Sequence, residues 1–376
     1  MARNTEFYKG RRKKRNRILI PTAIVLGLIS LAVVLFYGMQ KYVVISKEEV
    51  AVVLPIMGEN GTPFGAEDNT AAELETTEVR IAFEEPDYSG VEAVTGEGLE
   101  PIRAIFVPAE EINAEKLTEY AARLNVGNAL VLEMKPRSGA LVWDSKAAAA
   151  LSYGLAGSPL PEDVQRELAK LKEEGVYLAA QISVCRDELF AARSTIVTLK
   201  TTAGGNYTDE GGTWLDAYSV DVRNYTVELA RELWALGFDE VILADVAHPV
   251  LPEDTEVSYT REMSTKPSAV GAVCGFATYV AGELADRKGL LSIYVSSAPS
   301  LVRADSSNGQ DGPLFFKIYD RVYYATDRYA YTFNVDDVRR SVTIGEVNSR
   351  FVPVVQNYLP DNSGEISWVL IDTESN

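Results

Sequence analysis

Polar side chains stand where several runs of strand-forming residues end, and their types are those of acid–base chemistry. Glu133 and Lys135 close the run NALVLEMK, while Asp245 and His248 follow the run EVILA. Later runs of the same kind carry Tyr323, Tyr324 and Gln356. If these strand ends meet in the fold, their polar groups can act on one substrate, and two carboxyl groups among them can supply an acid and a base.

Asp245 follows the apolar run VILA, so we expect its side chain to be largely buried. A buried carboxyl group needs a charged partner or a raised pKa, and Lys135 or Arg186 could be that partner. For any acid at these strand ends, the alternative is a solvated rim charge or a structural ion pair. His248 could pass a proton near neutral pH, or it could be a hydrogen-bonding residue after its strand.

The elements that must position these residues alternate between strand-forming runs and amphipathic helical patterns. Helices are expected at 114–124, 162–174, 220–236 and 269–286. Strands are expected at 102–109, 128–135, 176–184, 240–246 and 290–298, and in FKIYDRVYYAT, FVPVVQNY and SWVLID. Eight strands alternating with helices predict an α/β fold of the (β/α)8 TIM-barrel type, in which ligands bind at the carboxyl ends of the strands. An open doubly wound sheet is the alternative, although no G-x-G-x-x-G motif follows the first strand.

The composition excludes several classes of protein. The chain has 376 residues, with 54 Asp and Glu against 36 Lys and Arg, and a formal net charge of −18. This acidic balance opposes nucleic-acid binding, which needs a dense basic surface. One histidine and the two cysteines, Cys185 and Cys274, cannot supply a multi-histidine or cysteine-rich zinc site. We therefore expect no metal, no cofactor and no nucleic-acid partner.

The amino-terminal region has the pattern of a membrane anchor. Residues 1–17 hold eight basic side chains and one acid, and residues 18–37 are twenty residues without a charge. A helix of that length can cross a lipid bilayer, and the basic excess before it predicts a cytoplasmic amino terminus and an extracytoplasmic body in the cell membrane. A cleaved signal peptide is the alternative, but the apolar run is longer than usual for one. Residues 38–100 have the composition of an acidic linker or stalk, with strand-forming stretches at 50–54 and 79–83.

The body of the chain also resembles a known family. The segments IRAIFVPAEEI, LVLEMKPRSGALVWDS, LKEEGVYLAAQISVCRD and, most specifically, WLDAYSVDVRNYTVELARELWALGFDEVILADV follow the order of the glycoside-hydrolase-like barrel family of bacterial envelope proteins. FFKIYDRVYYATDRY, VPVVQNY and SWVLID are similar to its last three strands. The likeness extends over about 270 residues, the size of one barrel. It implies a barrel at 101–376 that acts on a polysaccharide or an envelope glycan.

Individual site residues follow from this resemblance. Asp245 matches the strand-four aspartate of the family, Lys135 its strand-two lysine, and Trp214 and Asp216 its W-x-D residues. The strand-end rule adds His248, Tyr323, Tyr324 and Gln356 to them. The residues expected to bind substrate are therefore Lys135, Trp214, Asp216, His248, Tyr323, Tyr324 and Gln356.

The expected chemistry is hydrolysis by two carboxyl groups that flank the glycosidic bond. We expect Asp245, kept neutral by burial, to protonate the leaving oxygen, and Glu133 to act as base or nucleophile. Lys135 would position the charge. Since strand three separates strands two and four, a wide carboxyl spacing and inversion are favoured.

The chain departs from the family pattern at three places. Glu133 stands for the first aspartate of the D-x-K-D-x-x-G motif, and Pro136 replaces the second. After Asp245 the sequence VAHP replaces Y-x-R-F-P, so the family's arginine is missing. These departures motivate the alternative of a catalytically inactive barrel that binds glycan or a protein partner at the cell surface. A weaker reading is an anchored scaffold protein.

Overall fold

The computed structural model describes residues 43–45, 50–52, 93–124, 127–259, 267–326, 338–342, 345–359 and 363–372. The chain divides into two compact units, Met1–Val79 and Arg80–Asn376. In the first unit, the described residues form an antiparallel pair of short strands, β1 (Val43–Ile45) and β2 (Val50–Val52).

The membrane span predicted at 18–37 and the strand predicted at 79–83 lie outside the described residues. Among the residues that are described, no helix is both long and apolar enough to cross a bilayer. The anchor therefore remains a prediction from sequence.

The second unit is a closed barrel of eight strands, and every neighbouring pair is parallel. Its strands in chain order are β3 (Arg103–Val107), β4 (Ala129–Lys135), β5 (Tyr177–Ser183), β9 (Glu240–Ala244), β11 (Leu290–Val295), β12 (Val322–Ala325), β13 (Phe351–Gln356) and β14 (Trp368–Ile371). The last strand pairs with the first, which closes the ring. The predicted (β/α)8 barrel is confirmed, and the open doubly wound sheet is excluded.

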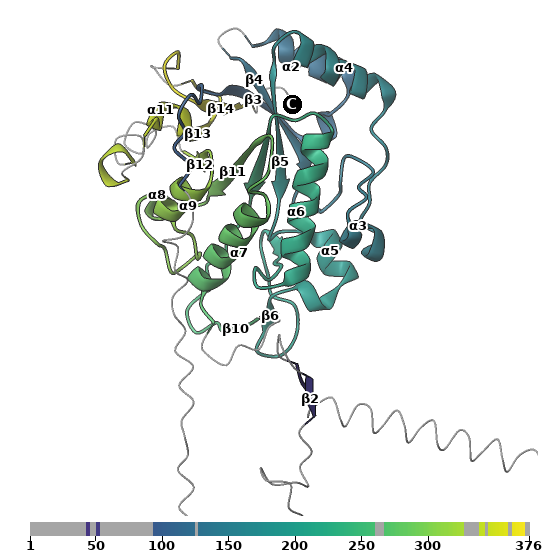
Figure 1. The fold of residues 1–376 in the computed structure, drawn as a ribbon, viewed down its shortest axis with the longest axis vertical. Coiled ribbons are helices and arrows are strands. Elements are labelled where there is room, and N and C mark those ends of the chain that lie inside the picture. Colours follow the sequence, from purple (N-terminus) through teal and green to yellow (C-terminus); the bar gives the residue numbers. More distant parts are fainter. Residues whose placement is uncertain are drawn as a thin grey trace, which may run out of the picture. The chain divides into compact units, whose positions relative to one another are not determined.

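Helices follow the strands and cover the outside of the barrel (Figure 1). The longer ones are α2 (Ala114–Ala122), α4 (Glu162–Glu173), α6 (Val220–Ala235) and α7 (Ala269–Glu283). The shorter ones are α3 (Ala148–Tyr153), α5 (Glu188–Arg193), α8 (Ala298–Val302), α9 (Gly312–Ile318) and α11 (Val347–Arg350), with 3₁₀ turns η3 (Ala109–Glu111) and η4 (Thr195–Val197). The long helices start and end within three residues of the predicted positions.

The sixth predicted strand needs one correction. Its first half, FKIYD, is not a strand: residues 316–318 end α9, and β12 begins only at Val322. The reason is a local helix start, because the Asp311 side chain accepts a hydrogen bond from the Leu314 N–H, and Pro313 stands in the first turn.

The amino-terminal ends of the strands are closed by a buried ion pair. Arg321 Nη1 lies 2.5 Å from Glu240 Oε2, and their side chains are 3% and 0% exposed. The hydroxyls of Tyr177 and Tyr323 also donate to Glu240, at 2.9 and 2.8 Å. Since this end is filled, an open cavity in the barrel has to lie at the opposite, carboxyl ends of the strands.

Two short antiparallel strand pairs lie in the loops at the carboxyl ends of the strands. β6 (Lys200–Thr201), in the loop after β5, pairs with β10 (Val257–Ser258), in the loop after β9. β7 (Thr208–Asp209) pairs with β8 (Gly212–Thr213) in the first of these loops. In Figure 1 the β6–β10 pair lies below the strands, so the long excursions of the sequence build up the mouth of the barrel.

Candidate active site

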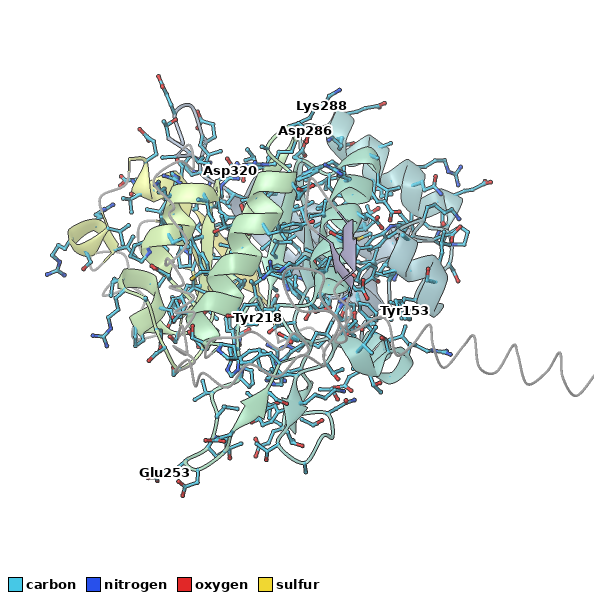
Figure 2. The ribbon with its side chains drawn as sticks, turned by 60° about the horizontal axis from the view of Figure 1, so that its bottom comes forward. Tyr153, Tyr218, Glu253, Asp286, Lys288 and Asp320 are labelled. Atoms are coloured by element: carbon cyan, nitrogen blue, oxygen red, sulfur yellow. The ribbon has the colours of Figure 1, made fainter. Side chains whose placement is uncertain are left out.

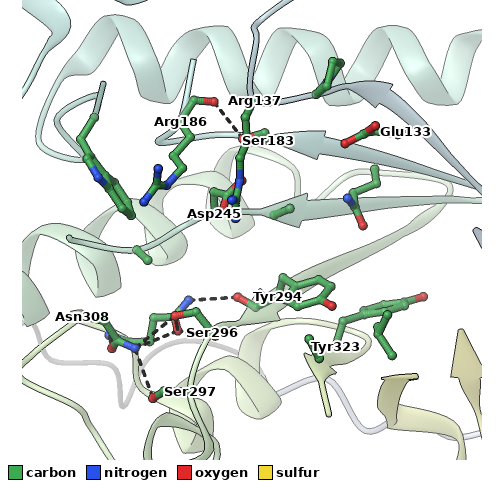
Figure 3. Close-up of a pocket in the computed structure, with 18 of the residues that line it drawn as sticks. Glu133, Arg137, Ser183, Arg186, Asp245, Tyr294, Ser296, Ser297, Asn308 and Tyr323 are labelled. Carbon is green, nitrogen blue, oxygen red and sulfur yellow. Dashed lines mark hydrogen bonds and ion pairs between the residues drawn. The ribbon is translucent and has the colours of Figure 1, made fainter. Parts of the chain in front are cut away.

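A cavity of about 870 Å³ opens at the carboxyl ends of the barrel strands. Every strand contributes to its lining: Phe106 from β3, Glu133 from β4, Ser183 from β5, Ala244 from β9, Tyr294 from β11, Tyr323 from β12, Val354 from β13 and Ile371 from β14. Figure 3 shows two facing walls. One carries Glu133, Arg137, Ser183, Arg186 and Asp245, and the other carries Tyr294, Ser296, Ser297 and Asn308. Glu133 and Asp245 thus line one cavity.

Asp245 stands directly after β9, and its side chain is 13% exposed. Its backbone has φ +54°, the left-handed region that Asp and Asn tolerate better than most residues. Arg137 binds the carboxylate with two nitrogens, Nη2 to Oδ1 at 2.6 Å and Nε to Oδ2 at 2.9 Å. Ser183 Oγ lies 2.7 Å from Oδ2. Asp245 is therefore held by a two-pronged guanidinium contact, the strongest ion-pair geometry that side chains form.

The prediction that Lys135 or Arg186 pairs with Asp245 is wrong, because Arg137 is the partner. Lys135 instead pairs with Asp187, with Nζ 2.8 Å from Oδ2, and both side chains are almost fully buried. Arg186 pairs with Asp209 at 2.9 Å. Lys135 is also absent from the cavity lining, so its predicted role beside the substrate is not supported by its position.

The strand itself explains why Lys135 faces away from the cavity. The pairing of β4 with β5 shifts register between Glu133 and Lys135, an irregularity of the β-bulge type. A bulge breaks the two-residue alternation of side chains, so residues two apart no longer share a face. Lys135 Nζ donates to the Ser183 carbonyl at 2.5 Å and thereby links β4 to β5 behind the site.

Glu133 has a very different environment from Asp245. Its contact with a backbone donor is a single long one, the Ala109 N–H to Oε2 at 3.3 Å. Burial raises the pKa of Glu133 above its ordinary value of 4.5, and the negative charges of Glu110 and Asp245 raise it further. The Ala109 N–H and the Arg137 charge oppose that shift but do not outweigh it. Glu133 is thus a carboxyl group that burial favours in its protonated form.

Arg186 and Trp214 form a second feature of the same wall. The Arg186 guanidinium lies over the Trp214 ring, 4.0 Å from its centroid, and the indole N–H donates to Asp209 at 2.7 Å. Trp214 lines the cavity but is only 5% exposed. Trp214 was expected to bind substrate, but the face of its ring that Arg186 covers is not open to a sugar.

His248 lies in the cavity lining and is 7% exposed. One ring nitrogen lies 2.8 Å from the Pro249 carbonyl and the other 3.2 Å from the Tyr259 hydroxyl. Burial lowers the pKa of His248 below its ordinary value of 6.5. Because both ring nitrogens lie within hydrogen-bond distance of a partner, the structure favours the hydrogen-bonding role, one of the two roles predicted for His248.

The remaining predicted residues divide between the cavity and the packing around it. Tyr323 lines the cavity with its ring, while its hydroxyl donates to the buried Glu240. Tyr324 points to the other side of β12 and packs against the helices. Asp216 is 1% exposed, accepts the Tyr218 N–H and is not among the residues that line the cavity. Gln356 is exposed and also outside the lining.

Several residues that line the cavity were not found from sequence. Ser296 and Ser297 directly follow β11, so the strand-end rule would have found them. Arg137 stands two residues beyond β4 and had the same signal. Asn308 and Gln310 lie in the loop before α9, where no pattern marks them. Gln310 links its loop to the segment after β9 and to β11, because its Nε2 donates to the carbonyls of Val246 and Tyr294 at 2.9 and 3.0 Å.

No group of three or more His, Cys, Asp or Glu side chains is placed to hold a metal ion in the described part of the chain. Cys185 and Cys274 are buried free thiols. The polar groups that line the cavity are carboxyl, guanidinium, imidazole, hydroxyl and amide groups, which suit acid–base chemistry on a hydroxyl-rich ligand.

Comparisons with known proteins agree with this picture. A family model described as "Putative glycosyl hydrolase domain" matches residues 104–327. No curated protein matches the sequence.

Among solved structures, the chain is similar to the glycoside hydrolase domain of PgaB (BpsB) from Bordetella bronchiseptica, with 15% identity, TM-score 0.49, and coverage of 72% of this chain and 94% of that chain. It is also similar to Ega3 from Aspergillus fumigatus, solved in complex with galactosamine, with 12% identity, TM-score 0.44, and coverage of 76% and 97%. A hypothetical protein from Ruminiclostridium thermocellum has 20% identity, TM-score 0.43, and coverage of 50% and 96%. Since these TM-scores are low, the family model carries the assignment.

Proposed function

Because the chain belongs to the "Putative glycosyl hydrolase domain" family, we propose that it hydrolyses glycosidic bonds of a polysaccharide or an envelope glycan in the cavity at the mouth of its barrel. The observation that carries this proposal is the pair of carboxyl groups, Glu133 and Asp245, which line that one cavity in contrasting environments. Glycoside hydrolysis in most families uses two carboxyl groups of this kind, one protonated and one ionised.

Glu133 is the general acid in this proposal. Its raised pKa keeps a proton on the carboxyl group at a higher pH than an exposed glutamate would. That proton would pass to the glycosidic oxygen as the bond to the leaving sugar breaks. This assignment reverses the one expected from sequence, in which Asp245 was the acid, because the guanidinium contact falls on Asp245 and not on Glu133.

Asp245 is then the group that acts on the anomeric carbon, directly as a nucleophile or through a water molecule as a base. Arg137 and Ser183 fix the direction of its two oxygens. The positive charge that develops on the sugar ring in the transition state is stabilised by the nearby carboxylate. The inverting outcome favoured by the strand order is tested by identifying the first anomer released.

The test is turnover of the full-length chain on a panel of bacterial-envelope and plant polysaccharides, with Asp245→Asn alongside. We expect the substitution to lower the rate at least about 100-fold, the usual contribution of an acid–base group. Asp254→Asn is the matched control, because Asp254 also has a left-handed backbone (φ +62°) but lies outside the cavity lining. Equal turnover by the wild type and Asp245→Asn would overturn the proposal.

Two observations favour the alternative of a glycan-binding barrel without activity. Arg137 occupies both oxygens of Asp245, and Pro136 stands where the family has a carboxylate. In that case the wild type and Asp245→Asn would both bind glycan on the panel and neither would release product.

The location of the protein is also a proposal. The basic run at 1–17 and the uncharged run at 18–37 support a single-pass anchor in the cell membrane, with the barrel on the extracytoplasmic side. The acidic segment at 38–100 would then separate the barrel from the bilayer. An extracytoplasmic position suits an enzyme whose substrate is an envelope glycan.

A further inference from the structure

A second cavity adjoins the main one. This outer chamber has a volume of about 410 Å³ and shares three lining residues with the main cavity: His248, Val250 and Ser307. The main cavity alone fills the upper part of the range of roughly 300–1,000 Å³ that a single small ligand occupies. The combined space therefore exceeds what one sugar unit at the carboxyl pair requires.

The walls of the outer chamber come from segments that lie outside the eight barrel strands. They are the loop after β9 with β10, the start of α7, and the loop before α9. Since β10 is paired with β6, the loop that carries Glu256 and Val257 is tied to the loop after β5. The chamber is a built extension of the mouth and not a gap beside one flexible loop.

The chemistry of the outer chamber suits sugar rings. Thr255, Ser306 and Ser307 supply hydroxyl groups, while Val250 and Leu251 supply apolar surface. Val250 is 67% exposed although it is a large apolar residue, and it lies where the two cavities meet. A sugar ring has both a hydroxyl edge and an apolar face, so it can use both kinds of surface.

The charged side chains of the described lining favour a ligand without acidic groups. In the main cavity each of the two guanidinium groups, Arg137 and Arg186, is already paired with an aspartate. The remaining charged side chains of the two linings, within the described residues, are Glu133 and Glu256. Burial lowers the pKa of His248, at the junction, and so disfavours the positively charged form of its imidazole. Among the described residues of the two linings, every guanidinium group is therefore paired, and none is left over to bind carboxylate, sulfate or phosphate groups.

We propose that the main cavity and the outer chamber form one groove for a linear glycan without acidic groups, in which sugar units occupy both chambers and an internal bond lies at Glu133 and Asp245. This inference rests on the proposed function and adds to it the class of substrate and an internal mode of cleavage.

The test compares oligosaccharides of different lengths and includes a negatively charged polysaccharide as a competitor. Cello-, malto- and chito-oligosaccharides of two to six units, labelled at the reducing end, are given to the full-length protein, with polygalacturonate as an acidic competitor. We expect kcat/KM to rise at least about tenfold from dimer to hexamer, with internal bonds cleaved first and no competition by polygalacturonate. Equal rates on dimers and hexamers, release of terminal units only, or strong competition by polygalacturonate would each overturn the inference.

A pair of variants assigns the length effect to the outer chamber. Glu256→Lys changes its lining, while Glu253→Lys is a matched change in the same loop, outside both linings. Figure 2 shows Glu253 at the outer tip of the molecule. We expect Glu256→Lys to lower the ratio of hexamer to dimer rates about threefold or more, and Glu253→Lys to leave that ratio as in the wild type. Identical ratios in all three proteins would contradict the groove.

Binding separates a failure of this inference from a failure of the proposed function. If no oligosaccharide is hydrolysed, the proposed hydrolase activity fails, and the same series is then titrated into the wild type and Asp245→Asn. Hexamers that bind at least about tenfold more tightly than dimers would still support the groove. Equal affinities, or no binding, would overturn it. If hydrolysis requires Asp245 but is independent of length, the proposed function stands and the groove does not.

Discussion

At the scale of single residues, the two carboxyl groups of the cavity differ in the donors around them. Asp245 receives two guanidinium nitrogens from Arg137 and has the Ser183 hydroxyl within hydrogen-bond distance. Glu133 has one long contact with a backbone N–H, and burial raises its pKa. In acid–base catalysis two groups with such opposed environments take opposite roles.

The proposed role of Glu133 predicts the pH dependence of activity. An acid with a raised pKa is protonated below that pKa, so kcat/KM should fall as pH rises through it, at a pH above the ordinary 4.5. Glu133→Gln should lower the rate at least about 100-fold and remove this alkaline limb from the residual activity. If the pH–rate profile of Glu133→Gln keeps the same alkaline limb, the group that titrates there is not Glu133. The measurement is the pH–rate profile of both proteins.

The same residue predicts a change of stability with pH. Because the folded-state pKa of Glu133 is raised, its contribution to stability is fully present below 4.5 and is lost as pH rises through the folded-state pKa. In thermal unfolding, the Tm of Glu133→Gln should therefore increase relative to the Tm of the wild type as pH rises. The difference between the two Tm values should be smallest at acidic pH. A difference of the opposite sign would mean that Glu133 is stabilised as a carboxylate.

At the scale of elements, the end of β4 decides which side chains reach the cavity. The irregular pairing between Glu133 and Lys135 turns Lys135 toward Asp187, which caps the start of α5 by accepting the Phe190 N–H. The chain then turns back so that Arg137 meets Asp245. Gly139 closes this turn with φ +82°, and a Cβ there would overlap the Asp187 carboxylate.

The geometry of this turn predicts that a single added methyl group at Gly139 strongly destabilises the protein. Gly139→Ala should destabilise the protein by about 1–2 kcal/mol from its left-handed backbone, and by further energy because Asp187 must move away from buried Lys135. Gly154→Ala is the matched control, since Gly154 also has positive φ (+66°) but nothing within 4 Å of its Cβ position. Equal losses in denaturant unfolding would show that the contact with Asp187 adds nothing.

At the scale of the whole molecule, the barrel has one closed end and one open end. The Glu240–Arg321 pair joins the starts of β9 and β12 inside the closed end. The open end holds the cavity and the extensions around it. Because a barrel has no free sheet edge, its stability depends on every strand remaining in the ring.

The buried ion pair at the closed end predicts how much stability is lost when one of its partners is removed. Arg321→Met should lower the free energy of unfolding by about 3–5 kcal/mol, because it leaves Glu240 charged, buried and unpaired. Lys146→Met removes a surface partner, that of Asp144, and should cost less than about 1 kcal/mol. Urea unfolding of both variants compares the two values. A small loss for Arg321→Met would mean that Glu240 becomes neutral at little cost.

The proposed anchor predicts how the whole chain fractionates. The full-length protein should stay with membranes after carbonate washing, because residues 18–37 would lie in the hydrocarbon core. A variant without residues 1–40 should be released into the soluble fraction. Extraction of the full-length chain by carbonate would contradict a transmembrane anchor, and an amino terminus that begins after residue 37 would indicate a cleaved signal peptide.

The sequence alone determined the eight strands, the long helices and the site end of the barrel. It could do so because hydrogen bonding and burial impose local periods of two and 3.6 residues, and because parallel strands bring their carboxyl ends together. The same rule selected Glu133, Asp245, His248 and Tyr323 for the cavity. The FKIYD segment failed because apolar residues alone do not distinguish a short helix from a strand.

Only the tertiary structure decided which charges meet. Lys135, Arg137 and Arg186 are all near strand ends, but the irregular pairing after Glu133 sends Lys135 to Asp187, and Arg186 turns onto Trp214. Arg137 alone reaches Asp245. The direction of a side chain at a strand end depends on bulges and turns that several distant segments fix together. For that reason our proposal reverses the roles of acid and base that were expected from the sequence, while the pair of carboxyl groups itself was already visible there.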